Sequence, residues 1–182
     1  FNPFQKLFGF MERQADAVVC LTKGDATHFR NAKIVQIIPN FIELPHSYVQ
    51  DYYRKRCIAV GRLEYQKGFD AVSYTHLYPQ YSLHIMPSRF EGQGIALVEA
   101  QACGLPSVVT DYIYGASDIV TNRYNGILVR QGDREAMINA ILEMMDSEKL
   151  RWEYGNNARI AARKYTKDNI MCKWVELISS LQ

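Results

Sequence analysis

One block of the sequence constrains the fold more than any other. An apolar run at residues 82–86 is expected to form a strand, and after a glycine-bearing turn residues 95–102 are expected to form a helix. Gly104 stands where a helix C-terminus favours a left-handed backbone, and Pro106 prevents the helix from continuing. A second strand is expected at residues 107–109, and two strands joined by a helix pair in parallel. The block predicts an α/β fold with a parallel sheet.

The rest of the chain adds elements of both kinds. Further short apolar runs predict strands at residues 17–21, 34–38, 57–60 and 127–129. A short helix is expected after Thr22, and three longer helices near the C-terminus are expected to begin at the N-cap residues Asp133, Ser147 and Thr166. In the last helix, apolar residues at helical spacing predict a stripe that faces the core, namely Ile170, Trp174, Leu177, Ile178 and Leu181.

Composition and charge narrow the class of protein. Hydrophobic residues make up 48% of the chain and charged residues 22%, as in folded globular proteins. The net charge of +2, carried by scattered Lys and Arg, gives no argument for nucleic acid as a partner. No stretch approaches the roughly 20 apolar residues of a spanning helix, and no signal peptide is recognisable. We expect a cytoplasmic protein, and a start at Phe1 without Met indicates part of a longer reading frame.

Cysteine and histidine form no metal or catalytic motif. The chain has no Cys-x-x-Cys pair and no His at zinc spacing, so we expect reduced, mostly buried thiols at Cys20, Cys57, Cys103 and Cys172. The histidines are dispersed, and we assign no role to His28, His46, His76 and His84.

The turn before the helix at residues 95–102 is the first candidate site. Free backbone N–H groups at a helix start favour a bound anion. Glu91 lies in the turn and Glu99 lies one to two turns into the helix, so both carboxylates are expected to face one crevice. A carboxylate accepts two hydroxyl hydrogen bonds, and such charge-assisted bonds are about twice as strong as neutral ones. The pattern favours a sugar ligand.

A second block follows the strand expected at residues 57–60. Arg62 and Lys67 lie in a turn bounded by Gly61 and Gly68, at the carboxyl edge of the predicted sheet. Two cations placed there can converge on one diphosphate and neutralise a leaving group.

Together the two blocks resemble the signature of family four of the retaining glycosyltransferases, which have the GT-B fold. The matching residues are Gly-Arg-Leu and Lys-Gly-Phe-Asp within residues 61–70, then Pro-Ser-Arg-Phe-Glu-Gly and Glu-Ala-x-Ala-Cys-Gly-Leu-Pro within residues 87–106. Residues 37–40 resemble the family's hinge, and residues 125–129 its late Asn-Gly-strand element. The resemblance implies the C-terminal half of a GT-B fold: a Rossmann-like parallel sheet with flanking helices, a reduced number of strands and a helical C-terminus.

The resemblance also implies roles for residues. Arg62 and Lys67 would bind the donor diphosphate, Glu99 the ribose hydroxyls, and Glu91 hydroxyls of the transferred sugar near the reacting carbon. Backbone amides would come from Gly94, Ile95 and Ala96. Positioned charges can stabilise an oxocarbenium-like sugar and a departing phosphate. The sequence contains no Asp-x-Asp, so no metal is expected.

The implied activity is retaining transfer of a hexose-type sugar. The donor would be a UDP- or GDP-sugar and the acceptor a glycan or lipid-linked molecule, as in surface polysaccharide synthesis with peripheral membrane contact. A non-catalytic nucleotide-sugar-binding module is one alternative, and another GT-B enzyme such as an epimerase or phosphorylase is a second. A dinucleotide enzyme is not favoured, because Leu97 stands where the third glycine of that fingerprint belongs.

The match to the family is incomplete. We expect residues 1–45 to be the tail of an acceptor-side domain with the hinge, residues 46–56 a linker and residues 57–182 the donor-binding domain. Only residues 71–86 stand where the family has several more elements, which indicates an internal deletion. We therefore expect this chain by itself to be an inactive fragment. Gln93 replaces a Phe of the family and is expected to alter packing at the sugar pocket.

Overall fold

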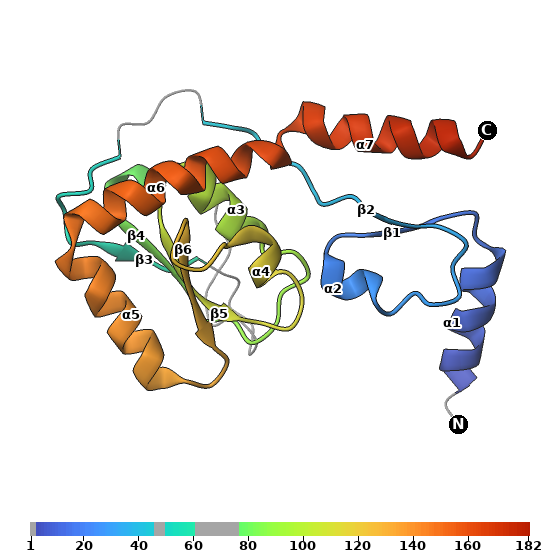
Figure 1. The fold of residues 1–182 in the computed structure, drawn as a ribbon, viewed down its shortest axis with the longest axis horizontal. Coiled ribbons are helices and arrows are strands. Elements are labelled where there is room, and N and C mark those ends of the chain that lie inside the picture. Colours follow the sequence, from blue (N-terminus) through green and yellow to red (C-terminus); the bar gives the residue numbers. More distant parts are fainter. Residues whose placement is uncertain (1–2, 46–49, 61–76) are drawn as a thin grey trace.

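The computed structural model describes residues 3–45, 50–60 and 77–182. These residues form two lobes, and two segments of the chain cross between them (Figure 1). The small lobe contains α1 (Pro3–Gln14), β1 (Val18–Cys20), α2 (Lys23–Ala26) and β2 (Val35–Ile37), and β1 pairs with β2 in parallel. The large lobe contains the remaining strands and most of the helices (Figure 1).

A parallel sheet forms the centre of the large lobe. Its order is β3-β4-β5-β6, with bounds Cys57–Ile58, Leu83–Met86, Ser107–Asp111 and Gly126–Arg130. All three neighbouring pairs run in parallel, which confirms the predicted strand-helix-strand unit. In a parallel sheet all carboxyl ends lie at one edge, so the turns that follow β4, β5 and β6 are neighbours.

Helices cover both faces of this sheet. The lobe contains α3 (Ile95–Ala102), α4 (Ala116–Ile119), α5 (Arg134–Asp146) and α6 (Glu148–Ala162), with short 3-10 turns η1 (Tyr78–Gln80) and η2 (Arg163–Tyr165). Successive strand residues point to opposite faces. Val109 accordingly packs in a core with α3 and α4, whereas Val108 packs in a second core with α5. A parallel sheet that is buried on both faces between two helical layers is typical of an α/β protein.

Local signals in the sequence explain where the helices begin and end. The carboxylate of Asp133 accepts a hydrogen bond from the N–H of Ala136 (2.8 Å), and the hydroxyl of Ser147 accepts one from Leu150 (3.2 Å). These bonds confirm two predicted N-caps, since they satisfy amides that have no acceptor inside the helix. Gly104 has the left-handed backbone expected of it, with φ +80.

Two close contacts fix α6 on the large lobe. Gly155 lies so near the carbonyl of Gly104 and the hydroxyl of Tyr52 that a Cβ at this position would overlap both. Arg151, 2% exposed, donates to the carbonyl oxygens of Tyr52 (2.7 and 3.1 Å), Met144 (2.7 Å) and Met145 (2.7 Å). This buried guanidinium therefore closes the C-terminus of α5 and holds the segment that precedes β3.

The last helix, α7 (Lys167–Ser180), returns to the small lobe, where it lies beside β2 (Figure 1). Ile170 and Leu177 are buried against Ile38, as the stripe predicted. The rest of that prediction is wrong, because Trp174, Ile178 and Leu181 are 36%, 54% and 44% exposed. The described small lobe offers a sheet of only two strands, which is too narrow to cover the whole stripe.

Two chain segments cross between the lobes side by side. The first follows β2, and the second joins η2 to α7. The N–H of Ile42 donates to the carbonyl of Tyr165 (2.9 Å), and Ile42 pairs in parallel with Thr166. The two crossings are therefore hydrogen-bonded to each other.

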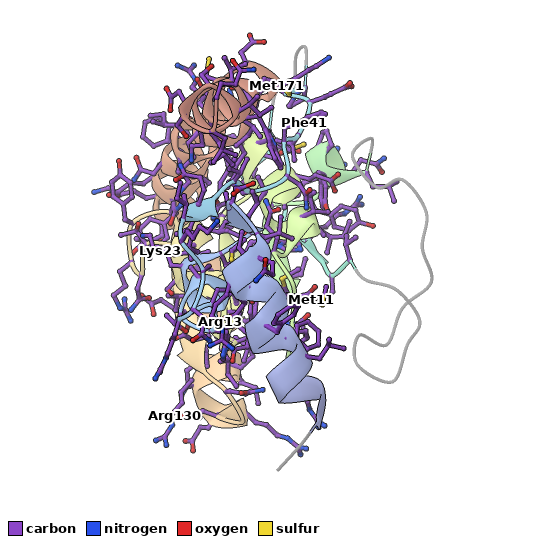
Figure 2. All side chains as sticks on the ribbon, turned by 90° about the vertical axis from the view of Figure 1, so that its right-hand side faces the viewer. Met11, Arg13, Lys23, Phe41, Arg130 and Met171 are labelled. Carbon is purple, nitrogen blue, oxygen red and sulfur yellow. The ribbon has the colours of Figure 1, made fainter. Side chains whose placement is uncertain are left out.

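Apolar side chains are exposed on α1, for example Phe8 (61%) and Met11 (57%). Figure 2 looks onto this side, with α1 in front and with Met11 and Met171 labelled. In the described part of the chain no helix is long and apolar enough to cross a membrane. The four cysteines are free; Cys20 and Cys103 are buried as expected, but Cys172 is exposed.

Candidate functional site

The candidate site is built on the turn between β4 and α3. This turn leaves the sheet at its carboxyl edge and carries Glu91, which is 6% exposed. The hydroxyl of Ser88 donates to Oε1 of Glu91 (2.8 Å). The predicted sugar-binding carboxylate is therefore oriented by a residue of its own turn.

Glycine is required where the turn becomes a helix. Gly94 is the N-cap of α3 and has φ +77, a conformation that disfavours a side chain. A Cβ at Gly94 would also overlap the hydroxyl of Tyr112. Ile95 and Ala96 follow as the first helical residues, whose amides have no acceptor inside the helix. The three residues predicted to offer amides thus lie together at the amino end of α3.

The space above the turn is open at Gly92. A Cβ built at Gly92 would meet no atom within 4 Å, in contrast to Gly94. A ligand can therefore approach the backbone at this point of the turn without displacing a side chain.

Glu99, the second predicted carboxylate, lies on α3 and is partly buried. Burial raises the pKa of this carboxyl above its ordinary value. Glu91 and Glu99 thus both belong to the β4–α3 unit, one in the turn and one in the helix. Their meeting in a single crevice stays a prediction.

The two predicted cations, Arg62 and Lys67, lie outside the described residues. The strand before them, β3, pairs with β4, so the chain approaches this block from the same sheet. Among residues 3–45, 50–60 and 77–182, no group of three or more His, Cys, Asp or Glu side chains could hold a metal ion.

Tyr112 is a site residue that the sequence analysis did not single out. Its side chain is 2% exposed, and its hydroxyl has no hydrogen-bond partner among the described residues. Burial and the neighbouring Glu91 carboxylate both raise the pKa of Tyr112, burial more strongly. The available signal was its position directly after β5, because that strand ends at the same edge as β4.

Gln93 connects the turn to the crossing segment after β2. The side chain is 5% exposed; its Oε1 accepts from the N–H of Asn40 (2.7 Å) and its Nε2 donates to the carbonyl of Asn40 (3.2 Å). The departure from the family pattern thus creates a pair of hydrogen bonds to the hinge.

The late Asn-Gly pair has a structural explanation. Asn125 is completely buried; its amide donates to the carbonyl of Ile119 (3.1 Å) and its oxygen accepts from the N–H of Thr121 (2.7 Å). A Cβ at Gly126 would meet the carbonyl of Ser107 at 2.5 Å, so only glycine lets β6 approach β5 this closely.

Comparison with curated proteins identifies relatives that match about half of the chain. Poly(ribitol-phosphate) alpha-N-acetylglucosaminyltransferase of Staphylococcus aureus is 33% identical over 101 residues, which cover 55% of this chain and 20% of the relative. Poly(glycerol-phosphate) alpha-glucosyltransferase of Bacillus subtilis is 33% identical over 99 residues, 54% of this chain and 15% of the relative. The chain therefore spans a minor part of these proteins.

Solved structures resemble the whole described fold. TarM of S. aureus, in a complex that includes UDP, matches with a TM-score of 0.80 and 19% identity over 97% of this chain and 46% of that chain. Sucrose-phosphate synthase of Thermosynechococcus elongatus matches with a TM-score of 0.83 and 17% identity over 97% and 61% of the two chains. At these identities the structural likeness shows only the fold, which corresponds to one half of a GT-B protein.

A family model covers the candidate site itself. It is the model of the glycosyl transferases group 1, and it matches residues 71–161, half of the 182 residues. The matched segment contains the β4–α3 turn, both predicted carboxylates and the buried Asn-Gly pair. The chain belongs to the glycosyl transferases group 1 family.

Proposed function

We propose that this chain is the nucleotide-sugar-binding part of a retaining glycosyltransferase. The observation that carries the proposal is the β4–α3 unit, where Glu91, Glu99 and the open amino end of α3 lie within the segment matched by the family model. A helix amino end favours phosphate, and buried carboxylates favour sugar hydroxyls.

In the proposed reaction, Glu91 accepts hydrogen bonds from the transferred sugar and Glu99 from the ribose. The amides of residues 94–96 and the side chains of Arg62 and Lys67 neutralise the departing diphosphate. These groups stabilise charge that develops in the transition state, and such stabilisation requires no metal ion.

The proposed donor is a UDP-sugar carrying a hexose. Two similar structures support this choice, since TarM was solved with UDP and the Anabaena protein HepE with UDP and glucose. The proposed acceptor is a glycan or lipid-linked molecule of surface polysaccharide synthesis. Relatives named for poly(ribitol-phosphate), poly(glycerol-phosphate) and capsular polysaccharide support it.

We further propose that residues 57–182 bind the donor, that residues 1–45 belong to an acceptor-side domain, and that residues 46–56 link the two. Transfer requires a cleft between two complete domains. The described small lobe has a two-stranded sheet, and the chain spans 46% of TarM. We therefore propose that the chain alone binds the donor without turning it over.

Calorimetric titration of residues 1–182 with UDP, GDP and their sugars tests this function. We expect UDP to bind and Glu99→Gln to weaken binding by about tenfold, since one charge-assisted hydrogen bond contributes about that factor. The matched control is Glu153→Gln, which makes the same change at an exposed position of α6 and leaves binding unchanged. Absence of nucleotide binding by the folded chain would refute the proposal, and turnover would refute the inactivity of the chain.

A further inference from the structure

A hollow of about 650 Å³ lies at the carboxyl edge of the large sheet. Pro87 follows β4, Thr110 belongs to β5 and Arg130 ends β6, so three neighbouring strands contribute to its wall. Figure 2 labels Arg130 at the end of the molecule opposite Met171. The residues that line the hollow do not include Glu91, Glu99 or residues 94–96. The hollow therefore adjoins the candidate donor site through Arg89 of the β4–α3 turn, but the predicted carboxylates do not line it.

Three arginines line this arginine hollow. They come from different elements: Arg89 from the β4–α3 turn, Arg130 from the end of β6, and Arg134 from the first position of α5. The amide of Gln131 donates to the carbonyl of Arg89 (2.9 Å), which joins the turn to the loop after β6. The relative position of these elements is therefore fixed by the fold.

Acidic groups near the hollow compensate this positive charge only in part. Asp133 lines the hollow, but its carboxylate caps α5 through Ala136 (2.8 Å). Asp111 stands opposite Arg130 in the pairing of β5 with β6. In the described part of the chain, no ion pair joins any of the three arginines to an acid, and the excess charge can attract an anion.

The shape of the hollow restricts the anion. A guanidinium binds phosphate oxygens through two parallel N–H bonds, so three of them suit a phosphate better than a carboxylate. The volume exceeds what a single phosphate fills, and Pro87, Met137 and Ile138 give the lining an apolar part. These features fit a phosphate carried on an organic skeleton.

We propose that the arginine hollow binds a phosphate or phosphodiester group of the acceptor. This inference rests on the proposed function, in which Arg62 and Lys67 hold the donor phosphates. Arg89 lies two residues before Glu91 in one turn, so an acceptor phosphate held by Arg89 is positioned relative to the sugar-binding carboxylate by the backbone. The skeleton that carries the phosphate is a polyol chain or a lipid.

The test is calorimetric titration of the 182-residue chain with an oligomer of glycerol phosphate and with geranyl diphosphate. We expect one of the two to bind, and its identity shows whether the skeleton is a polyol or a lipid. Arg130→Gln and Arg134→Gln should each weaken binding by at least about tenfold. Arg134→Lys should weaken it less, because charge is kept while the two-pronged contact is lost. The control Arg30→Gln removes the same charge from the small lobe and should have no effect.

Three results would overturn the inference. Binding of inorganic phosphate as tightly as the bound probe would make the hollow a site for the free ion. An equal loss in Arg30→Gln would mean non-specific charge attraction, and displacement of the probe by UDP would assign the hollow to the donor. All three arginines are exposed, so thermal unfolding should be unchanged in the variants. UDP titration of the same variants keeps this test separate from that of the donor site.

Discussion

Gly155 and Gly9 allow the same substitution to be tested in two helices with opposite expected signs. Gly155 lies inside α6 and Gly9 inside α1. Alanine in place of glycine in a helix interior stabilises by about 1 kcal/mol where space permits. At Gly9 an added Cβ meets only the amide of Asn31 at 3.6 Å, an ordinary contact. We expect Gly9→Ala to raise the free energy of unfolding by about 1 kcal/mol.

At Gly155 the added methyl group overlaps the carbonyl of Gly104 and the hydroxyl of Tyr52. These two groups also form a buried hydrogen bond of 2.9 Å with each other, which α6 would push apart. Overpacking costs about 1–3 kcal/mol and a hydrogen bond about 1 kcal/mol, which together exceed the gain in helix propensity. We expect Gly155→Ala to lower the free energy of unfolding by about 2 kcal/mol.

Urea unfolding followed by circular dichroism measures both variants under one set of conditions. In thermal unfolding, a loss of about 2 kcal/mol corresponds to a Tm lower by about 4–8 °C. If Gly155→Ala proves neutral or stabilising while Gly9→Ala stabilises, the packing of α6 on the Gly104 turn is not as described.

Three further substitutions probe buried groups. Burial lowers the pKa of His84 to about 4, below its value in the unfolded chain. The free energy of unfolding therefore falls as the pH drops, by about 2 kcal/mol between pH 7 and 5. In urea unfolding, His84→Gln should lose this dependence on pH. Gln93→Leu should cost about 1–2 kcal/mol by breaking both bonds to Asn40. Gln93→Glu should cost at least as much at pH 7, because a buried carboxylate cannot donate to the carbonyl of Asn40; equal stability of Gln93→Leu would contradict the pairing. Arg151→Met should cost at least about 3 kcal/mol, whereas the exposed control Lys149→Met should change stability by less than about 0.5 kcal/mol.

Local rules predicted most of the large lobe. The strand-turn-helix block, the left-handed Gly104 and the caps at Asp133 and Ser147 depend on neighbours in sequence, and the structure confirms them. Thr166 also occupies an N-cap, but its side chain makes no capping bond. Parallel pairing followed from the connection alone, because a helix between two strands leaves little choice.

Features that depend on distant contacts were harder to predict. The apolar stripe on α7 has the predicted helical period, but the predicted burial is wrong at Trp174. Burial there depends on the width of the small lobe against which α7 packs. The sequence signalled Tyr112 only through its position after a strand, because its place beside Gly94 arises only when β4 and β5 are adjacent. The partner of Gln93 was likewise unpredictable, since Asn40 is distant in sequence.

The paired crossings restrict how the lobes can move relative to each other. A single covalent connection permits both twisting and bending. Here Ile42 and Thr166 belong to two chain segments that run in the same direction and are hydrogen-bonded to each other. Twisting one lobe about the long axis of the connection would shear the bond from Ile42 to Tyr165, whereas bending about an axis through it would not. We therefore expect the lobes to bend near Ile42 rather than twist, and any opening must also break the contacts of α2 with the large lobe, such as the hydrogen bond from the N–H of Lys23 to Asp118 (2.8 Å).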